Sequence, residues 1–195
     1  VVPGSGGKDS VYAAHLLKYK YGMHPITVTW PPICYTEYGY NNFKNWLEIG
    51  GFDNITLKPN GRVMKLLTKL SIINLLHPFQ TFILGQKNLA PKIATQLGIS
   101  LVFYGENEAE YGNPISDNAS SLRDKSFYAL SNLEEMYLGG VTVKELQEKY
   151  KIDLADLMTF LPPTPESLSK TNIEVHYLGY YTKWVPQEVY YYAVE

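Results

Sequence analysis

The residue types best suited to bind a phosphate group occur near the start of the chain, in the segment Ser5-Gly6-Gly7-Lys8-Asp9-Ser10. Two adjacent glycines allow the backbone to approach a ligand closely and to adopt positive φ. Their N–H groups, together with those of a following helix, could point at an anion. Lys8 would add a positive charge, and Asp9 would either cap the helix or bind magnesium. The alternative is an ordinary strand-to-helix turn, because Ser, Asp and Gly are common in turns.

A second candidate segment is acidic and reads Gly105-Glu106-Asn107-Glu108-Ala109-Glu110-Tyr111-Gly112. It follows the apolar residues 101–104, which are typical of a buried parallel strand. Carboxylates crowded at the end of a strand are costly unless they are solvated or hold a cation. Because Mg²⁺ takes one or two carboxylates beside nucleotide phosphates, Glu106 and Asp9 are the candidate metal ligands. A merely solvated acidic loop is the alternative.

An alternation of strands and helices would bring both segments to the same end of a sheet. Apolar patterns predict helices over 10–21, 40–49, 61–76 and 82–97, and strands over 26–30, 55–57 and 101–104. These units predict an α/β fold with a doubly wound, mostly parallel sheet and right-handed crossovers. Ligands of such sheets bind outside the carboxyl ends of the strands. Thr29 and Trp30 are therefore expected to line an adenine pocket; the alternative is that Trp30 only covers the sheet edge.

The pattern changes after residue 113. Capping boxes predict short helices that start at Ser131, with Glu134, and at Thr142, with Glu145. Leucines suggest one more short helix over 154–161, while 173–184 and 190–195 resemble strands. We expect an ATP-binding α/β domain at 1–112, then a helical insertion and a tyrosine-rich, substrate-side segment at 113–195. Because both ends stop within strand-like runs, we expect the chain to be part of a longer protein.

Composition narrows the class of protein. The chain has 195 residues, a formal net charge of −2 and one cysteine, Cys34. A single cysteine rules out an internal disulfide or a zinc site built from several cysteines, and it favours a reducing, cytoplasmic setting. No apolar run approaches the roughly 18 residues that a membrane span needs. The net charge does not indicate a broad basic surface that could bind nucleic acid. We therefore expect neither membrane insertion nor nucleic-acid binding.

The phosphate segment resembles the pyrophosphate-binding loop of the PP-loop ATP pyrophosphatases, which have an adenine nucleotide alpha hydrolase-like fold. It is not a Walker A loop, because Val2 stands where that motif has glycine and Asp9 stands where it has Ser or Thr. A narrower resemblance is to the bacterial N-acetyl sugar amidotransferases of surface-polysaccharide and flagellin-sugar biosynthesis. It rests on Gly85-Gln86-Lys87 with Pro91-Lys92-Ile93-Ala94, Tyr104 to Gly112, His176-Tyr177-Leu178-Gly179-Tyr180-Tyr181, and Lys183-Trp184 with Pro186-Gln187. Gly4 departs from the family pattern, which has a small β-branched residue at this position.

This resemblance implies an enzyme that converts the acetamido group of an N-acetylated nucleotide sugar into an acetamidino group. ATP would adenylate the amide oxygen, and ammonia would then displace AMP, so ATP and Mg²⁺ are the implied cofactors. Lys8 and Asp9 are the candidate catalytic residues, and Asp9 and Glu106 the candidate metal ligands. The candidate nucleotide-binding residues are Ser5, Gly6, Gly7, Lys8, Asp9, Ser10, Thr29, Trp30 and Gly105. The candidate substrate-side residues are Gln86, Lys87, Asn107, Glu108, Glu110, Tyr111, His176, Tyr180 and Lys183.

The implied reaction needs a source of ammonia. A glutaminase usually requires a cysteine activated by a nearby base, and the surroundings of Cys34 carry no such signature. We therefore expect a separate glutaminase partner, and a homo-oligomer is compatible with the sequence. Two alternatives remain open. One is a PP-loop enzyme that modifies tRNA, and the other is a nucleotide-binding sensor without turnover.

Overall fold

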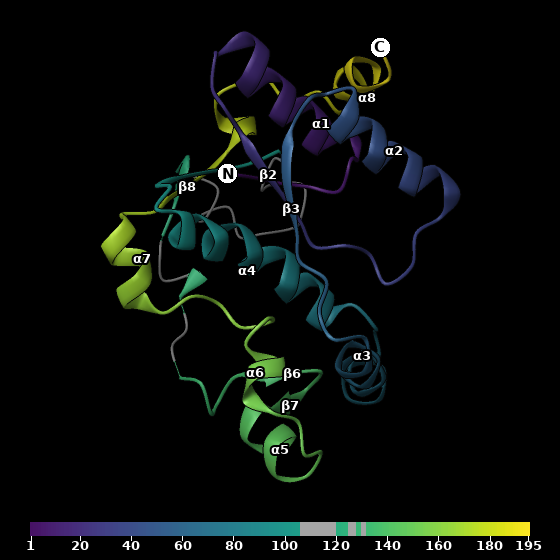
Figure 1. The fold of residues 1–195 in the computed structure, drawn as a ribbon, viewed down its shortest axis with the longest axis vertical. Helices are drawn as coiled ribbons and strands as arrows, with labels where there is room; N and C mark the ends of the chain where they lie inside the picture. Colours follow the sequence, from purple (N-terminus) through teal and green to yellow (C-terminus); the bar gives the residue numbers. More distant parts are fainter. Residues whose placement is uncertain (106–119, 125–127, 130–131) are drawn as a thin grey trace.

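The computed structural model of the chain describes residues 1–105, 120–124, 128–129 and 132–195 (Figure 1). Its strands are β1 (Val2–Pro3), β2 (Ile26–Thr29), β3 (Asp53–Thr56), β4 (Leu101–Tyr104), β5 (Leu122–Arg123), β6 (Tyr137–Leu138), β7 (Val141–Thr142) and β8 (Glu174–Tyr177). Its helices are α1 (Lys8–His15), α2 (Glu37–Glu48), α3 (Gly61–Leu75), α4 (Gln80–Leu97), α5 (Val143–Glu148), α6 (Leu154–Leu157), α7 (Pro165–Thr171) and α8 (Pro186–Val194). The predicted α/β class is confirmed.

The central sheet is mostly parallel. One part has the parallel order β1-β2-β3; in the other, β4-β8-β5, strand β8 is parallel to β4 and β5 is antiparallel to β8. Two hydrogen bonds join the parts: Val1 donates to the carbonyl of Leu101 (2.7 Å), and Phe103 donates to the carbonyl of Val1 (2.9 Å). Slanted bonds of this kind join parallel neighbours. The order across the sheet is therefore β3-β2-β1-β4-β8-β5.

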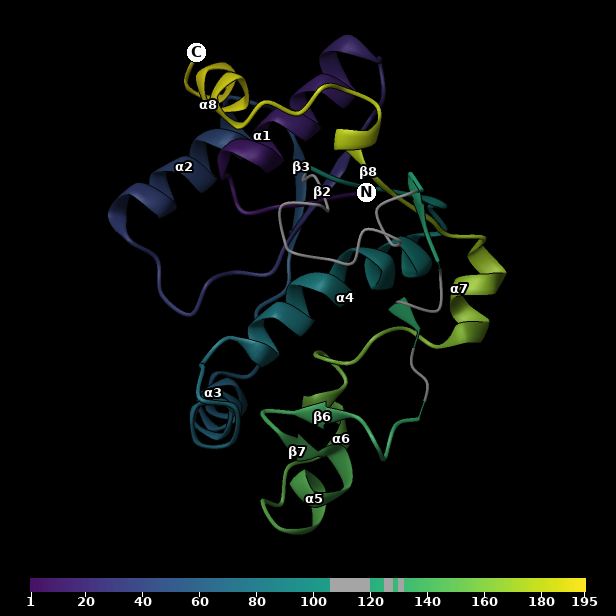
Figure 2. The same ribbon diagram turned by 180° about the vertical axis from the view of Figure 1, so that it is seen from behind.

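Helices cover both faces of this sheet, as the two opposite views show (Figures 1 and 2). On one face, α1, α2 and α8 lie together over a core that includes Ala13 and Trp46. On the other face, α3, α4 and α7 enclose the larger core, to which Leu67, Leu89 and Leu168 belong. Helices on both faces of a parallel sheet are the arrangement that the strand and helix pattern predicts.

The first helix differs from its prediction over 10–21 at both ends. It begins at Lys8 and changes after His15 into a π-helical stretch, Leu16–Lys20. Gly22, with a φ of +66°, follows as the glycine expected beyond a helix end. The earlier start matters, because it brings the N-terminal N–H groups of α1 to the phosphate segment.

The strand predicted at 190–195 is wrong, since these residues belong mainly to helix α8. Pro186 suits the first helical position, where no N–H is needed. The aromatic residues then pack on α1: the Tyr192 ring is edge-on to Tyr12 at 5.0 Å, and its hydroxyl lies 2.5 Å from His15 Nδ1. Packing against α1 therefore outweighs the strand preference of tyrosine and valine.

The other elements near the sheet lie close to their predictions. Helices α3 and α4 and strands β2 and β4 occupy the expected positions, and β3 lies at Asp53–Thr56 instead of 55–57. Helix α2 starts earlier than residue 40 because Thr36 caps it, accepting a hydrogen bond from the Gly39 N–H (3.0 Å). The strand expected over 173–184 forms only as β8, which pairs with β4, because a 3-10 helix, Leu178–Tyr180, ends it.

A small unit made of β6, β7, α5 and α6 packs below α3 and α4 in Figure 1. The helix predicted to start at Ser131 is wrong: residues 133–135 form a turn, and the β6–β7 hairpin follows. Gly139 and Gly140 close this hairpin at positive φ, which explains why a hairpin forms here. The predicted cap at Thr142 is confirmed, because its hydroxyl accepts from the Glu145 N–H (3.1 Å).

Polar contacts connect the small unit to α4. The Gln80 side chain accepts a hydrogen bond from the N–H of Gly139 (2.8 Å) and donates one to the carbonyl of Tyr137 (3.2 Å). Asn88 donates to the carbonyl of Phe160 (2.9 Å). The unit is thus held against the helix that also lines the pocket described below. In the described part of the chain, no helix has both the length and the apolar character that crossing a membrane requires.

Candidate functional site

A pocket of about 530 Å³ lies at the carboxyl ends of β1 and β4. After β1 the chain continues to β2 and β3 on one side of β1, and it then returns to form β4 on the opposite side of β1. The strand order therefore reverses between β1 and β4. In open parallel sheets ligands bind at this switch point. The described residues that line the pocket are Pro3, Gly4, Ser5, Gly7, Asp9, Ser10, Val28, Trp30, Ile83, Gln86, Lys87, Leu89, Tyr104, Gly105, Tyr128 and Tyr177.

The phosphate segment forms one wall and leads into α1. Gly7 is the residue before the helix, and no side chain in the described structure caps its first N–H groups. Ser10 turns back and donates to the carbonyl of Gly7 (3.0 Å). Among the described residues, no heavy atom lies within 4 Å of the position that a Cβ on Gly7 would take. The segment therefore offers uncapped N–H groups beside open space, which is what an anion at a helix N-terminus needs.

Helix α2 packs closely against two glycines of this part of the chain. A Cβ on Gly4 would lie 2.2 Å from Ser10 Cβ and 2.9 Å from Trp46 Cη2. Gly6 has a φ of +82°, and a Cβ there would lie 2.7 Å from the Phe43 Cα. Neither position has room for a side chain. Gly4 departs from the expected β-branched residue because Trp46 and Ser10 fill that volume.

Gly105 brings the end of β4 against the start of α1. A Cβ at this position would lie 2.3 Å from the Asp9 carbonyl oxygen and 2.9 Å from Ala13 Cβ. The close approach lets the β4 end and the phosphate segment line one pocket. Gly105, one of the candidate nucleotide-binding residues, thus lies beside the start of α1.

Lys8 and Asp9, the two candidate catalytic residues, form an ion pair with 2.6 Å between Lys8 Nζ and Asp9 Oδ1. Asp9 lines the pocket, whereas Lys8 is not among the described lining residues. The predicted second metal ligand, Glu106, lies outside the described residues, as do Asn107, Glu108, Glu110 and Tyr111. Within the described residues, no three His, Cys, Asp or Glu side chains gather as a metal site would require.

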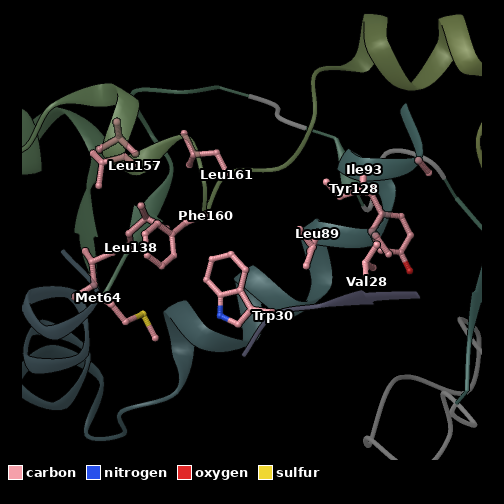
Figure 3. Close-up of a cluster of buried hydrophobic side chains, with 14 of the residues drawn as sticks. Val28, Trp30, Met64, Leu89, Ile93, Tyr128, Leu138, Leu157, Phe160 and Leu161 are labelled. Atoms are coloured by element: carbon pink, nitrogen blue, oxygen red, sulfur yellow. The ribbon is translucent and has the colours of Figure 1, made fainter. Parts of the chain in front are cut away.

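The β2 side of the pocket is apolar. Trp30 is only 4% exposed, and its ring meets Phe160 edge-on at 5.3 Å between centroids (Figure 3). It therefore both lines the pocket and belongs to the core. Thr29 does not line the described pocket: it is fully buried, and its hydroxyl accepts a hydrogen bond from Asn54 Nδ2 (3.0 Å). Alternation along β2 turns neighbouring side chains to opposite faces, so Thr29 and Trp30 could not both line the pocket.

The β4–β8 side of the pocket is aromatic. Tyr104 stacks with Tyr177 at 5.3 Å and with Tyr128 at 6.3 Å, and the hydroxyls of Tyr128 and Tyr177 are 3.3 Å apart. The Tyr104 hydroxyl donates to the carbonyl of Lys87 (2.9 Å), and Lys87 Nζ lies 5.8 Å from the centroid of the Tyr128 ring. Burial, with a smaller effect of the Arg123 charge, lowers the pKa of Lys87 to about 8. We refer to Tyr104, Tyr128 and Tyr177 as the tyrosine wall.

The tyrosine wall was not predicted, because Tyr104 and Tyr177 meet only through the parallel pairing of β4 with β8. Gln86 and Lys87, two of the candidate substrate-side residues, line the pocket. His176 does not: it lies on the opposite face, stacked on Phe103 and bonded to the Tyr181 hydroxyl (2.7 Å). Tyr180 and Lys183 also lie outside the described lining.

No protein-family model matches the chain, and no curated protein matches it. Among solved structures, one match is the crystal structure of a predicted subunit of tRNA methyltransferase from Methanocaldococcus jannaschii. It is 16% identical, the match covers 100% of this chain and 74% of that chain, and the TM-score is 0.49. A likeness at this level carries no argument about function.

Proposed function

We propose that the chain binds ATP in this pocket and transfers AMP to an oxygen of a second substrate, releasing pyrophosphate. One observation carries the proposal. The uncapped start of α1, the open space at Gly7 and the end of β4 at Gly105 all meet in one pocket at the switch point of the sheet. The volume of about 530 Å³ falls within the range of roughly 300–1,000 Å³ that is usual for small-molecule sites.

Each part of the pocket suits a part of the nucleotide. The N–H groups at the start of α1, together with the backbone at Ser5 and Gly7, would hold the phosphates that leave as pyrophosphate. Trp30 and Leu89 give an apolar surface for the adenine at the β2 side. Lys8, held beside Asp9, would offset the charge that develops on the leaving pyrophosphate.

The described residues supply one candidate ligand for magnesium, Asp9. Asp9 places a carboxylate in the pocket beside the expected phosphates, as Mg²⁺ sites in nucleotide-binding proteins commonly do. One of its oxygens accepts from Lys8, so the other would serve the metal. A bound Mg²⁺ would neutralise phosphate charge, and Asp9 would orient it.

For the second substrate we propose an N-acetylated nucleotide sugar, on the basis of the sequence resemblance. The amide oxygen attacks the α-phosphorus, the bond to the β-phosphate oxygen breaks, and pyrophosphate leaves. Ammonia then adds to the amide carbon, the bond to the AMP oxygen breaks, and loss of a proton leaves the amidine. The chain would act mainly by positioning and charge neutralisation. We propose a separate glutaminase as the source of ammonia.

The experiment supplies the protein with ATP, Mg²⁺, ammonium and a panel of N-acetylated nucleotide sugars, and follows the products by phosphorus NMR and mass spectrometry. The expected products are AMP, pyrophosphate and a sugar whose mass is lower by one unit, since an oxygen is replaced by NH. ADP with phosphate would exclude adenylation.

The same assay separates the alternatives. AMP formation that requires tRNA instead of a sugar would indicate an RNA-modifying enzyme. ATP binding without turnover with any acceptor would indicate a nucleotide-binding sensor. Because a sensor and an incomplete chain give the same negative result, the sensor test uses the longest natural form of the protein.

A further inference from the structure

One exposed face of α3 is cationic at its start and apolar at its end. The residues on this face follow the helical spacing of three and four positions: Arg62, Lys65, Lys69, Ile72 and Leu76. All five are exposed, and the opposite side of the helix is buried in the larger core. The outward face therefore does not contribute to the packing that forms the fold.

The apolar end of this face continues past the helix into the turn before α4. Leu76 is 89% exposed, and Ile72, Ile73 and Phe79 are 51%, 60% and 51% exposed. Leu76 also has a φ of +59°, which glycine and asparagine adopt more easily than leucine. In both views α3 lies at the edge of the molecule (Figures 1 and 2). Neither the backbone nor the core requires a leucine here, which points to a contact outside the chain.

The cations of this face are not neutralised by the described residues. In the part of the chain that the structure describes, no ion pair or side-chain hydrogen bond involves the side chains of Arg62, Lys65 or Lys69. Asp156 approaches the start of α3, but its carboxylate accepts a hydrogen bond from Asn60 (3.1 Å). The three positive charges are therefore available to an anionic partner.

The sequence carries the same bias over a longer stretch. Residues 54–105 contain no Asp or Glu, whereas the whole chain contains 19 of these residues. The net charge of −2 therefore conceals a basic region. Charge complementarity requires that the partner of this region be negatively charged.

We propose that this face of α3 binds the surface of a membrane that is rich in anionic lipids. The three cations contact the lipid phosphates, and the apolar end enters the boundary between the headgroups and the acyl chains. Binding of this kind needs no helix that crosses the membrane. It is independent of the proposed adenylation, because the described residues that line the pocket include none of the residues of this face.

Two other partners match only one part of the face. In a symmetric dimer formed through this face, the cations of the two copies would lie close together and repel each other. An RNA would pair with the cations, but RNA is bound through charges and stacked aromatic rings and would not use Ile72, Ile73 and Leu76. A membrane surface offers both negative charge and an apolar layer, so it matches both parts.

The test is co-sedimentation of the purified protein with sucrose-loaded vesicles. One set of vesicles is pure phosphatidylcholine, and the other contains equal parts of phosphatidylcholine and phosphatidylglycerol. We expect partition onto the anionic vesicles to be at least about tenfold stronger than onto the neutral ones. Partition onto the anionic vesicles should fall as salt is added, because salt screens the attraction between exposed charges.

Variants separate the contributions of charge and apolar area. Lys65→Gln and Lys69→Gln should each weaken partition onto the anionic vesicles about fivefold, the effect of one cation near such a surface. Leu76→Asn should weaken it about tenfold, and this variant should fold because asparagine suits the positive φ. The matched controls are Lys44→Gln and Ile49→Asn, which remove an exposed cation and a 79% exposed apolar side chain on and just after α2. Each control should change partition less than about twofold, and circular dichroism verifies the fold of every variant.

Three results would overturn the proposal. Equal partition onto neutral and anionic vesicles, or none onto either, would exclude an anionic membrane as the partner. Binding of tRNA that competes with the vesicles and is insensitive to Leu76→Asn would assign the face to RNA. A dimer in analytical ultracentrifugation that Leu76→Asn dissociates would assign it to a second copy of the chain. None of these results depends on ATP turnover, so failure of this proposal and failure of the proposed function can be distinguished.

Discussion

Trp30 packs directly on the backbone of Gly85, so that a Cβ at Gly85 would lie 2.2 Å from Trp30 Cε2. This contact joins the end of β2 to α4, and Trp30 also lines the pocket. Glycine in the interior of a helix weakens it by roughly 0.5–1 kcal/mol relative to alanine. Here the space that it leaves is filled by the Trp30 ring, which fixes the apolar end of the pocket.

Replacing Gly85 by alanine should therefore displace Trp30. We expect Gly85→Ala to lower the free energy of unfolding by about 1–3 kcal/mol, as overpacking commonly does, and to weaken ATP binding. Chemical denaturation and a titration with ATP measure the two effects. Gly61→Ala is the control, because no atom of the residues that the structure describes lies within 4 Å of its Cβ position at the start of α3. Equal stability of the Gly85 and Gly61 variants would contradict the packing account.

Two glycines near the phosphate segment should respond differently to replacement by alanine, because packing requires Gly4 whereas the proposed ligand requires Gly7. Gly4→Ala should lower the free energy of unfolding by about 1–3 kcal/mol, because its Cβ would overlap Ser10 and Trp46. Gly7→Ala should leave the free energy of unfolding within about 0.5 kcal/mol, since its φ of −75° suits alanine and its Cβ would contact none of the described residues. The same methyl group would, however, occupy space proposed for phosphate, so ATP affinity should fall about tenfold.

Thermal melts with and without ATP separate the two cases. ATP should raise the melting temperature of the wild type and of Gly4→Ala, and raise that of Gly7→Ala much less. A Gly7→Ala protein that binds ATP as well as the wild type would place the phosphates elsewhere.

The ion pair between Lys8 and Asp9 predicts a catalytic effect with little structural effect. Both side chains are partly exposed, at 35% and 27%, so the pair adds little to stability. We expect Lys8→Met to lower kcat for AMP formation by about 10²–10³-fold, the usual effect of removing one group that stabilises developing charge. Quenched-flow assays with radiolabelled ATP measure kcat, and circular dichroism checks the fold.

Lys44→Met provides a surface control, because Lys44 pairs with Glu48 on exposed α2. It should leave AMP formation unchanged. If Lys8→Met also retained full turnover, the phosphate segment could not be the adenylating site.

Local sequence patterns predicted the elements that carry the site but not the way they meet. The glycines of the phosphate segment and the apolar run before Gly105 have signatures that depend only on neighbouring residues. By contrast, the tyrosine wall joins Tyr104, Tyr128 and Tyr177 through a parallel pairing between distant strands. No local pattern encodes that register. His176 was a candidate for the substrate side, yet it lies on the opposite face of the sheet. Its face could not be predicted for the same reason, because it depends on how β8 pairs with β4.

The same limit explains the error at the C-terminus. Tyrosine and valine favour strands in isolation, yet α8 forms because Tyr192 and Val189 find partners in the folded molecule. Conversely, the hairpin at Gly139 and Gly140 replaced a predicted helix because glycines at positive φ fit the backbone of α3 closely: a Cβ at Gly139 would lie 2.8 Å from the Leu67 carbonyl oxygen. Tertiary contacts therefore determined the secondary structure of both segments.

The stability of the protein should depend on pH through Lys92. Burial lowers the pKa of this side chain to about 8, from an ordinary value of 10.5 that applies in the unfolded chain. Between these two values the unfolded state binds more protons than the folded state, so the free energy of unfolding should rise as pH increases through this range. The hydrogen bonds to Met158 (2.7 Å) and Thr159 (3.3 Å) persist, because a neutral amine still donates. Urea denaturation at pH 7.5, 8.5 and 9.5 should show a rise in the free energy of unfolding that is about 1–3 kcal/mol larger in the wild type than in Lys92→Met, because the variant lacks only this titratable group. Parallel pH profiles for the two proteins would show that Lys92 keeps its ordinary pKa.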